Sequence, residues 1–289
     1  KIYANSDIKV DYREYSQKIS IDVMVEEFVR PFNLAEPPLF RIQLVDWGER
    51  QVLLFDLHHI IADGVSTDIL FRDFSRLYAG HNLEKPAIQY QDYAVWQQDW
   101  IESGKLEDQA KFWHRQFEDS IPVLELPTDY ERPSVIDYQG STYSFELEEE
   151  LTHRLNQLAI EEETTLFMVL LAGYQILLSK RSGQEEIVVG SPIAGRPHPD
   201  LENILGIFVN TLPFINRPER EKNFREYLRE VKENALQVFE NQDYPFERLI
   251  NDLELKWDLS RNPIYDVVFV LQNTGEYEFE LDNAKLKLH

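Results

Sequence analysis

Two adjacent histidines, followed closely by an aspartate and a glycine, are the residues of this chain best suited to chemistry. His58 and His59 end a nearly continuous apolar run, and Asp63 and Gly64 follow within the next few positions. A histidine ring titrates near neutral pH, so it can accept a proton from an attacking amine or alcohol, or orient that group. A glycine here leaves room for a substrate carbonyl near backbone N–H groups. The segment therefore predicts acid–base or positioning chemistry on a carbonyl compound.

A metal centre is one alternative interpretation of the two histidines. Neighbouring residues of a strand point to opposite faces, so His58 and His59 are poorly placed to bind one ion together, and a metal centre needs further ligands around an open position. We predict no metal site and expect only one of the two rings to face a substrate. A purely structural pair stays open. Asp63 could orient an imidazole or fix the loop through a distant arginine, and the spacing does not decide between these roles.

Hydrophobic patterns predict the elements that position this segment. An almost entirely apolar strand is expected over 51–58, and after a short loop a helix is expected, capped by Ser66 and closed by Gly80. Rigid elements on both sides would hold an exposed loop in place. Further strands are predicted at 1–4, 39–45, 142–147, 186–191 and 264–271, and helices at 21–29, 89–117 with a break at Ser103-Gly104, 149–162, 166–180, 224–241 and 246–253.

The elements fall on both sides of a proline-rich linker at 121–138. Strands and helices mixed on each side predict an α/β protein with two similar lobes, residues 1–130 and 131–289. At 289 residues the chain is long enough for two lobes or one large fold.

Composition excludes several classes of function. The net charge is −23, with 52 Asp and Glu against 29 Lys and Arg, so we expect no nucleic acid and no membrane among its partners. The absence of cysteine excludes disulfides and thiolate nucleophiles and is typical of a cytoplasmic protein. No apolar run is long enough to span a bilayer, and the first residues lack the core of a signal peptide. The missing initiator methionine indicates a piece of a longer chain.

Five segments, in order along the chain, resemble the motifs of condensation domains from nonribosomal peptide synthetases, relatives of chloramphenicol acetyltransferase. They are Leu57–Ser66, Tyr90–Trp96, Leu205–Thr211, Asn241–Glu247 and Ser260–Pro263. Each segment alone has an ordinary explanation, such as buried aromatics on a helix or a proline that ends a helix. Five such segments in the family's order are not explained by coincidence. The family's first two motifs are absent and the C-terminal end is short, so the resemblance implies a domain truncated at the N-terminus and also at the C-terminus.

The resemblance implies a fold and a reaction. The fold is two acetyltransferase-like lobes, a pseudo-dimer, in a V with a central substrate tunnel. The reaction is peptide-bond formation, in which the amine of an acceptor aminoacyl thioester attacks a donor thioester. Both substrates arrive on phosphopantetheine arms of carrier proteins, so no cofactor is bound directly. The implied partners are the upstream donor carrier, the downstream acceptor carrier and a neighbouring adenylation domain.

The same resemblance assigns roles to individual residues. His59 is the histidine that faces the substrates, as a general base or as a group that positions the amine, while His58 points away and supports the loop. Asp63 is expected to pair with Arg196 across the lobes. The other residues implied at the site are Gly64, which leaves room for the thioester, and two residues along the tunnel, Ser66 and Asn210.

Related activities are distinguished by single residues. Gly64 argues against an epimerisation domain and the intact histidines against a cyclising one, and the sequence after Gly64 and around Gly206 resembles the subtype that joins an L donor to an L acceptor. A stand-alone acyltransferase using coenzyme A and a non-catalytic recruitment module of the same fold stay open as alternatives. The chain has no Gly-x-Ser-x-Gly elbow and no phosphate loop, so ATP-dependent activation is expected in another domain. If the missing parts belong to the substrate channel, the fragment is inactive as it stands.

Overall fold

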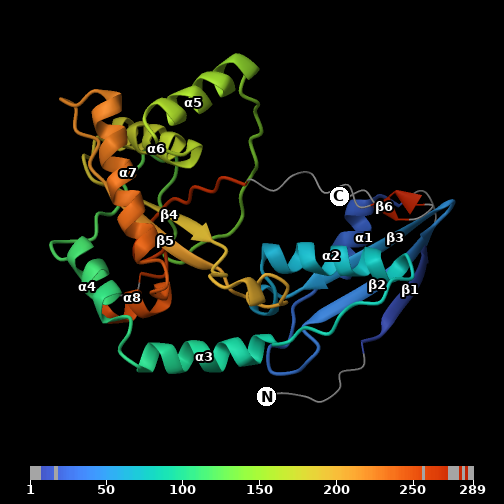
Figure 1. Ribbon diagram of the computed structural model, residues 1–289. Helices are drawn as coiled ribbons and strands as arrows, with labels where there is room; N and C mark the ends of the chain where they lie inside the picture. Colours follow the sequence, from blue (N-terminus) through green and yellow to red (C-terminus); the bar gives the residue numbers. More distant parts are fainter. Residues whose placement is uncertain (1–7, 16–18, 256–257, 273–279, 282–283, 286–289) are drawn as a thin grey trace. The chain divides into compact units, whose positions relative to one another are not determined.

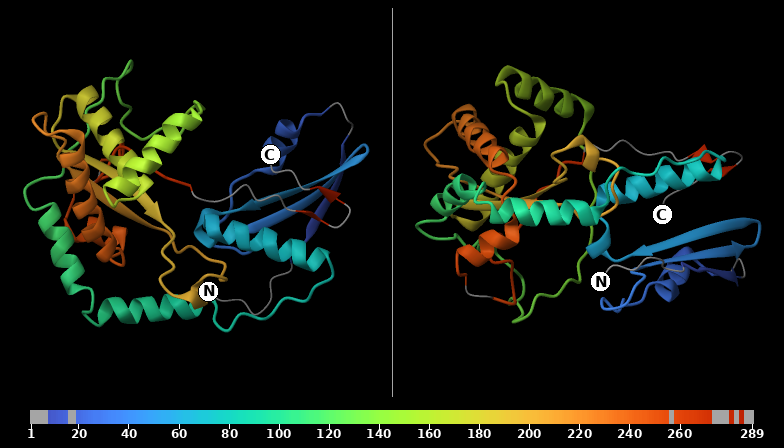
Figure 2. Two further views of the ribbon diagram at one scale, coloured as in Figure 1. Left: turned by 45° about the horizontal axis from the view of Figure 1, so that its top comes forward. Right: turned by 60° about the horizontal axis from the view of Figure 1, so that its bottom comes forward.

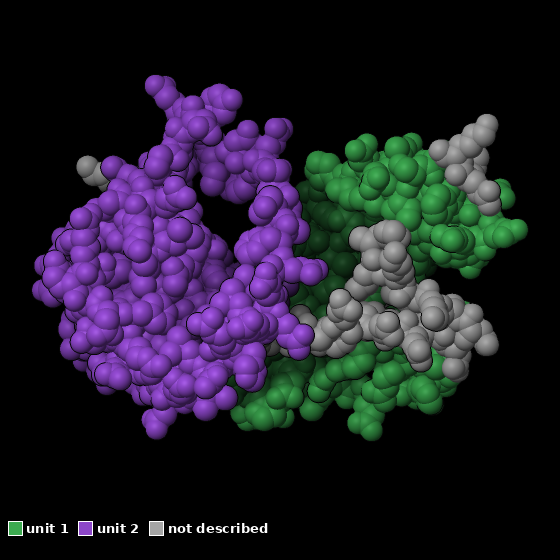
Figure 3. All heavy atoms as spheres, turned by 90° about the horizontal axis from the view of Figure 1, so that it is seen from above, with its two compact units in different colours: residues 1–93, 196–208, 278–289 green, residues 94–195, 209–277 purple. Residues whose placement is uncertain are grey.

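The computed structural model describes residues 8–15, 19–255, 258–272, 280–281 and 284–285. These form two compact units (Figure 3). The first unit takes the described residues of 1–93, 196–208 and 278–289, and the second takes those of 94–195 and 209–277. The first unit therefore includes a segment from far along the chain, 196–208. The lobe boundary predicted between residues 130 and 131 stays a prediction.

The first unit contains a three-stranded sheet with a helix on each face, and a short antiparallel sheet of β6 (Glu280–Leu281) and β7 (Ala284–Lys285). Strands β1 (Val10–Tyr15), β2 (Phe40–Trp47) and β3 (Arg50–Leu57) lie in that order, with β1 parallel to β2 and β3 antiparallel to β2. Helix α1 (Ile21–Phe28) covers one face and α2 (Gly64–Tyr78) the other, as the right-hand view of Figure 2 shows.

The alternation of side chains in β3 explains this two-sided cover. Leu54 packs with Met24 and Phe28 of α1, while the adjacent Phe55 points to the other face and makes edge contacts with Phe71 and Phe74 of α2. The strand is apolar on both faces because a helix covers each face, as its sequence predicted.

The second unit is mainly helical around a two-stranded antiparallel sheet, β4 (Ile187–Ile193) and β5 (Asn210–Asn216) (Figure 1). Its core joins the two strands to α6 and α7 and includes the fully buried Phe214, Leu171 and Leu228. The helices of this unit are α4 (Glu107–Gln116), α5 (Glu149–Glu161), α6 (Leu166–Ser182), α7 (Phe224–Glu240) and α8 (Phe246–Asp252). Helix α3 (Tyr90–Glu102) begins in the first unit and continues in the second.

A buried polar network fixes how α6, α7 and β5 meet. The side-chain amide of Gln175 is fully buried, donates to the Phe214 carbonyl, and accepts from the Asn216 amide at 3.0 Å and from the Tyr227 hydroxyl at 3.1 Å. Burial raises the pKa of Tyr227. Because each of these groups has a partner, the network orders the core without leaving an unpaired polar group.

Most predicted elements are present, and both units mix strands with helices, so the α/β class is confirmed. The break between α3 and α4 falls at Gly104, whose φ of 77° suits glycine. The strand predicted at 1–4 lies outside the described residues. Within the described residues, every helix is too short or too polar for a membrane span.

Three local predictions were wrong. Residues 142–147 form no strand, and Tyr143 and Phe145 are exposed, because an alternating pattern makes a strand only where a neighbouring strand supplies hydrogen bonds. The strand predicted at 264–271 is reduced to one bridge between Val268 and Gly190. Helix α2 is capped by Asp63, not by Ser66, because the Asp63 carboxylate accepts the N–H of Ser66 at 2.8 Å.

Candidate active site

The reaction loop, His58–Asp63, connects the end of β3 to the start of α2. His58 continues the strand for one more residue, since its N–H donates to the Leu39 carbonyl at 3.0 Å. Its ring Nδ1 accepts the N–H of Ile60 at 3.1 Å, which caps a short 3₁₀ turn, His59–Ile61. A neutral His58 ring that accepts at Nδ1 carries its proton on Nε2. His58 therefore supports the loop through a defined ring orientation.

His59 opens the 3₁₀ turn and is exposed. Its carbonyl accepts the N–H of Ala62 at 3.4 Å, which closes the turn. Among the described residues, no group forms a hydrogen bond or ion pair with the His59 ring. The ring is thus free to bond to a molecule other than this chain.

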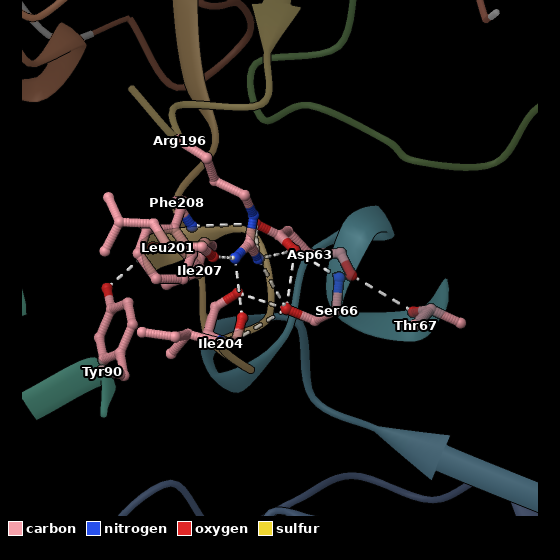
Figure 4. A network of polar contacts seen from close by, with 10 residues as sticks. Asp63, Ser66, Thr67, Tyr90, Arg196, Leu201, Ile204, Ile207 and Phe208 are labelled. Carbon is pink, nitrogen blue, oxygen red and sulfur yellow. Dashed lines mark hydrogen bonds and ion pairs between the residues drawn. The ribbon is translucent and has the colours of Figure 1, made fainter. Parts of the chain in front are cut away.

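Asp63 is the centre of a buried polar network at the start of α2 (Figure 4). It is 5% exposed. Its Oδ1 accepts the Ser66 N–H and lies 2.7 Å from the Ser66 hydroxyl, and its Oδ2 accepts the Phe208 N–H at 3.0 Å. Burial alone would raise the pKa of Asp63, but the bonds from Phe208 and Ser66 and the charge of Arg196 hold that pKa below its usual value. The carboxylate is therefore ionised and fully used by the chain itself.

Arg196 is the counter-charge of Asp63. Its Nη2 lies 3.0 Å from Oδ1 and 3.2 Å from Oδ2, and both side chains are 5% exposed. Its Nη1 donates to the carbonyls of Leu201 and Ile204, and the guanidinium lies 4.0 Å from the centre of the Phe208 ring. The predicted pairing is present, but both partners belong to the first compact unit, because segment 196–208 folds with residues 1–93. Arg196 thus fixes that segment against the start of α2.

Ser66 and Gly206 make a second connection between α2 and this segment. The Ser66 hydroxyl, 1% exposed, accepts the Gly206 N–H at 3.0 Å, and the Asp63 N–H donates to the Gly206 carbonyl at 3.3 Å. Tyr90 donates its hydroxyl to the Ile207 carbonyl at 2.8 Å. A Cβ on Gly206 would overlap the Tyr90 ring, so only glycine fits there. Gly206 had no predicted role in the site, although the motif Leu205–Thr211 contains it.

The remaining predicted site residues lie in different surroundings. Gly64 is the exposed first residue of α2, and a Cβ added there would meet no atom within 4 Å. Asn210 lies in the second unit, where its amide donates to the carbonyls of Gln242 and Tyr244 and accepts the N–H groups of Thr211 and Phe246. All its hydrogen-bonding capacity is used in fastening β5 to the chain before α8. The expected places of Ser66 and Asn210 along a substrate tunnel stay predictions.

Within the part of the chain that the structure describes, no group of three or more histidine, aspartate or glutamate side chains is arranged to hold a metal ion. The site is thus one exposed imidazole on a loop whose neighbouring motif side chains bond to the chain itself. Such an arrangement can position or deprotonate a nucleophile.

Comparison with known proteins places the chain in a family. The family model described as "Condensation domain" matches residues 1–289. The chain is 49% identical over 288 residues to gramicidin S synthase 2 of Brevibacillus brevis, covering 99% of the chain and 6% of that protein. It is 44% identical over 290 residues to tyrocidine synthase 3 of Brevibacillus parabrevis, covering 100% of the chain and 4% of that protein. The chain therefore spans only a small part of the length of these relatives.

Solved structures agree with this placement. A four-domain nonribosomal peptide synthetase bound to AMP and glycine superposes with a TM-score of 0.84 at 28% identity, covering 93% of this chain and 21% of that one. The fold is shared with the first condensation domain of the CDA synthetase, with a TM-score of 0.72 at 17% identity over 97% of this chain and 64% of that one. The chain belongs to the condensation-domain family of nonribosomal peptide synthetases.

Proposed function

We propose that this chain carries the amide-forming centre of a condensation domain and that His59 is its catalytic residue. One observation supports this most directly. His58, Asp63 and Ser66 bond to groups of the chain itself, whereas the exposed ring of His59 has no such bond among the described residues. A loop held firmly on both sides of one free imidazole is suited to positioning a nucleophile.

The proposed reaction joins an acceptor amine to a donor thioester. The amine nitrogen attacks the thioester carbonyl carbon, the new C–N bond forms, and the C–S bond breaks as the thiolate leaves. The ammonium formed on attack loses its proton, and the leaving thiolate gains one to become the thiol. His59 either accepts that proton or orients the amine by a hydrogen bond, and Gly64 leaves space beside the first turn of α2 for the thioester.

The partners and setting belong to the same proposal. The donor and acceptor are carried on phosphopantetheine arms by an upstream and a downstream carrier domain, with an adenylation domain beside them, and the domain holds no cofactor of its own. In the proposed fold, two acetyltransferase-like lobes form a V with a tunnel between them. The proposed reaction joins an L donor to an L acceptor, and the proposed location is the cytoplasm. High identity to parts of large peptide synthases supports this setting.

The direct test is dipeptide formation on loaded carriers. The condensation domain, expressed within its full synthetase module, would be mixed with donor and acceptor carriers and the products read by mass spectrometry. His59→Ala is expected to lower the rate about 100- to 10,000-fold if the ring is a general base. His81→Ala, an exposed histidine of the same unit, is the matched control and should leave the rate unchanged. No dipeptide from the unmodified module with several cognate pairs would refute the proposal.

The same mixture distinguishes the alternatives. A stand-alone acyltransferase would transfer an acyl group from coenzyme A to the acceptor, and a recruitment module would bind carriers without forming any amide. We expect the unmodified module to use carrier-bound donors and to ignore acyl-coenzyme A, since the Asp-Phe-Gly-Trp-Gly motif of plant-type acyltransferases does not occur in this sequence.

A further inference from the structure

Four side chains form a cluster beside the reaction loop, on the α1 side of the sheet. They are Phe32, Arg41, Asp56 and His58, and we call them the loop-support cluster. Arg41 on β2 and Asp56 on β3 are direct partners in the strand register. His58 follows Asp56 by two residues and so shares its face of the sheet. All four belong to the first unit.

Arg41 contacts three groups, and among the described residues its ion pair with Asp56 has no hydrogen bond between Nη1 and Oδ2. Its Nη2 donates to the Arg30 carbonyl at 2.6 Å, and its Nη1 lies 3.3 Å from the Asp56 carboxylate. The Cζ atom of the guanidinium lies over the Phe32 ring, 3.6 Å from the ring centre. The side chains of the ion pair are 14% and 16% exposed. Only a planar cation can stack on an aromatic ring while its edge bonds to a carbonyl, so lysine cannot replace these contacts.

Phe32 connects Arg41 to the reaction loop through its contact with the His58 ring. Its ring meets the His58 ring edge to face, with the centroids 6.0 Å apart and the planes at 90°. Because His58 Nδ1 accepts the Ile60 N–H, the orientation of the His58 ring determines the geometry of the turn that begins at His59. The contacts therefore run without a break from Arg41 through Phe32 and His58 to the His59 turn.

The Arg41–Asp56 ion pair is not explained by its contribution to stability alone. Removing Arg41 and Asp56 from water carries a desolvation penalty, and a well-packed apolar pair of similar volume is often as stable or more so. The Arg41–Asp56 pair is better explained by the geometry that it holds. The Arg41 guanidinium lies over the Phe32 ring while one of its N–H groups donates to the Arg30 carbonyl.

We propose that Arg41 is a positioning residue of the condensation reaction, which holds the His59 turn through Phe32 and His58. The inference rests on the proposed function. Arg41 touches no reacting atom in this scheme. Its loss should lower the rate of the chemical step and leave the binding of carriers unchanged, since the cluster acts on the orientation of the loop and not on a docking surface.

The first experiment measures single-turnover dipeptide formation by the full module. Arg41→Lys is expected to lower the rate at saturating carriers about 10- to 100-fold, the loss that a small misplacement of a catalytic group produces. The carrier concentration for half-maximal rate should stay the same within error. Arg13→Lys, in the exposed Arg13–Glu27 pair of the same unit, is the matched control and should change neither value. An unchanged single-turnover rate for folded Arg41→Lys would overturn the proposal.

The second experiment does not depend on activity. In the module labelled with ¹⁵N-histidine, the His58 ring is expected to show an unprotonated Nδ1 and a protonated Nε2, assigned by its loss in His58→Gln. Arg41→Lys and Phe32→Leu should both change the His58 ring signals from this single tautomer to a mixture of the two tautomers. Phe32→Leu should do so while the Arg41–Asp56 pair stays intact. Unchanged His58 signals in both variants would contradict the proposal. If the unmodified module forms no dipeptide, the proposed function fails, and the His58 signals still decide whether Arg41 orders the loop.

Discussion

Replacing Asp63 by asparagine tests the buried pair that anchors the start of α2. Both carboxylate oxygens accept hydrogen bonds, Oδ1 from Ser66 and Oδ2 from the Phe208 N–H, and both lie within 3.2 Å of Arg196 Nη2. Asparagine offers one oxygen and one NH₂ group, so in either orientation a donor faces a donor. It also leaves the Arg196 guanidinium buried without a counter-charge.

The expected cost follows from burial. Breaking a buried ion pair by removing one partner costs about 3 to 5 kcal/mol. At about 2 to 4 °C per kcal/mol for a protein of this size, the melting temperature should fall by about 6 to 20 °C. The measurement is thermal unfolding by circular dichroism, with urea unfolding as a second probe. Asp200→Asn is the matched control, because its side chain is 65% exposed in a surface pair with His198, and its effect should stay within about 0.5 kcal/mol.

A double replacement separates pairing from packing. Arg196→Met alone strands the Asp63 carboxylate. Asp63→Asn together with Arg196→Met leaves no unpaired charge, so the double change should cost less than the sum of the two single changes. If Asp63→Asn unfolds like the unmodified domain and keeps its full activity, the reasoning is refuted, because the network would then neither stabilise the unit nor support the reaction loop.

Further predictions follow from other parts of the structure. Gly206→Ala should destabilise the first unit and slow dipeptide formation, because the new Cβ would overlap the Tyr90 ring. Adding Tyr90→Ala to the same chain should restore part of the stability and part of the rate, as measured by thermal unfolding and by the dipeptide assay. Gln175→Leu should cost at least about 3 kcal/mol in urea unfolding, because a buried amide, hydroxyl and carbonyl lose their partner. The lowered pKa of Asp63 means that its contribution to stability is complete above the unfolded value of about 3.9 and is lost as the pH falls through the folded value, so the stability difference from Asp63→Asn should shrink below about pH 4.

The sequence predicted the strand, loop and helix around His59 well because each signal is local. The apolar run of β3 needs burial on both faces, and the helix after the loop shows its apolar stripe within its own residues. The cap was misassigned because Asp63 and Ser66 are both good N-cap residues and only the structure shows which side chain receives the N–H. That choice matters, since it moves Ser66 from the helix end into the buried network.

The pairing of Asp63 with Arg196 could be predicted from the sequence only through the family resemblance. Arg196 and Phe208 lie more than 130 residues after Asp63, and no periodic pattern predicts such a contact. The exclusion of a side chain at Gly206 depends on the Tyr90 ring in another element, so it too is invisible to local rules. The same limit explains residues 142–147, whose alternation predicted a strand that has no pairing partner among the described residues.

The two supports of the reaction loop differ in kind. Asp63 is held by a network in which hydrogen bonds lower its pKa and Arg196 supplies the counter-charge, so its role depends on charge. His58 is held by ring contacts and one backbone N–H, so its role depends on shape. Between them the His59 ring bonds to nothing in the described chain, and the two supports share no residue. A loop fixed independently at each end can keep an exposed, uncommitted imidazole in one place, which is the structural condition for the chemistry proposed for it.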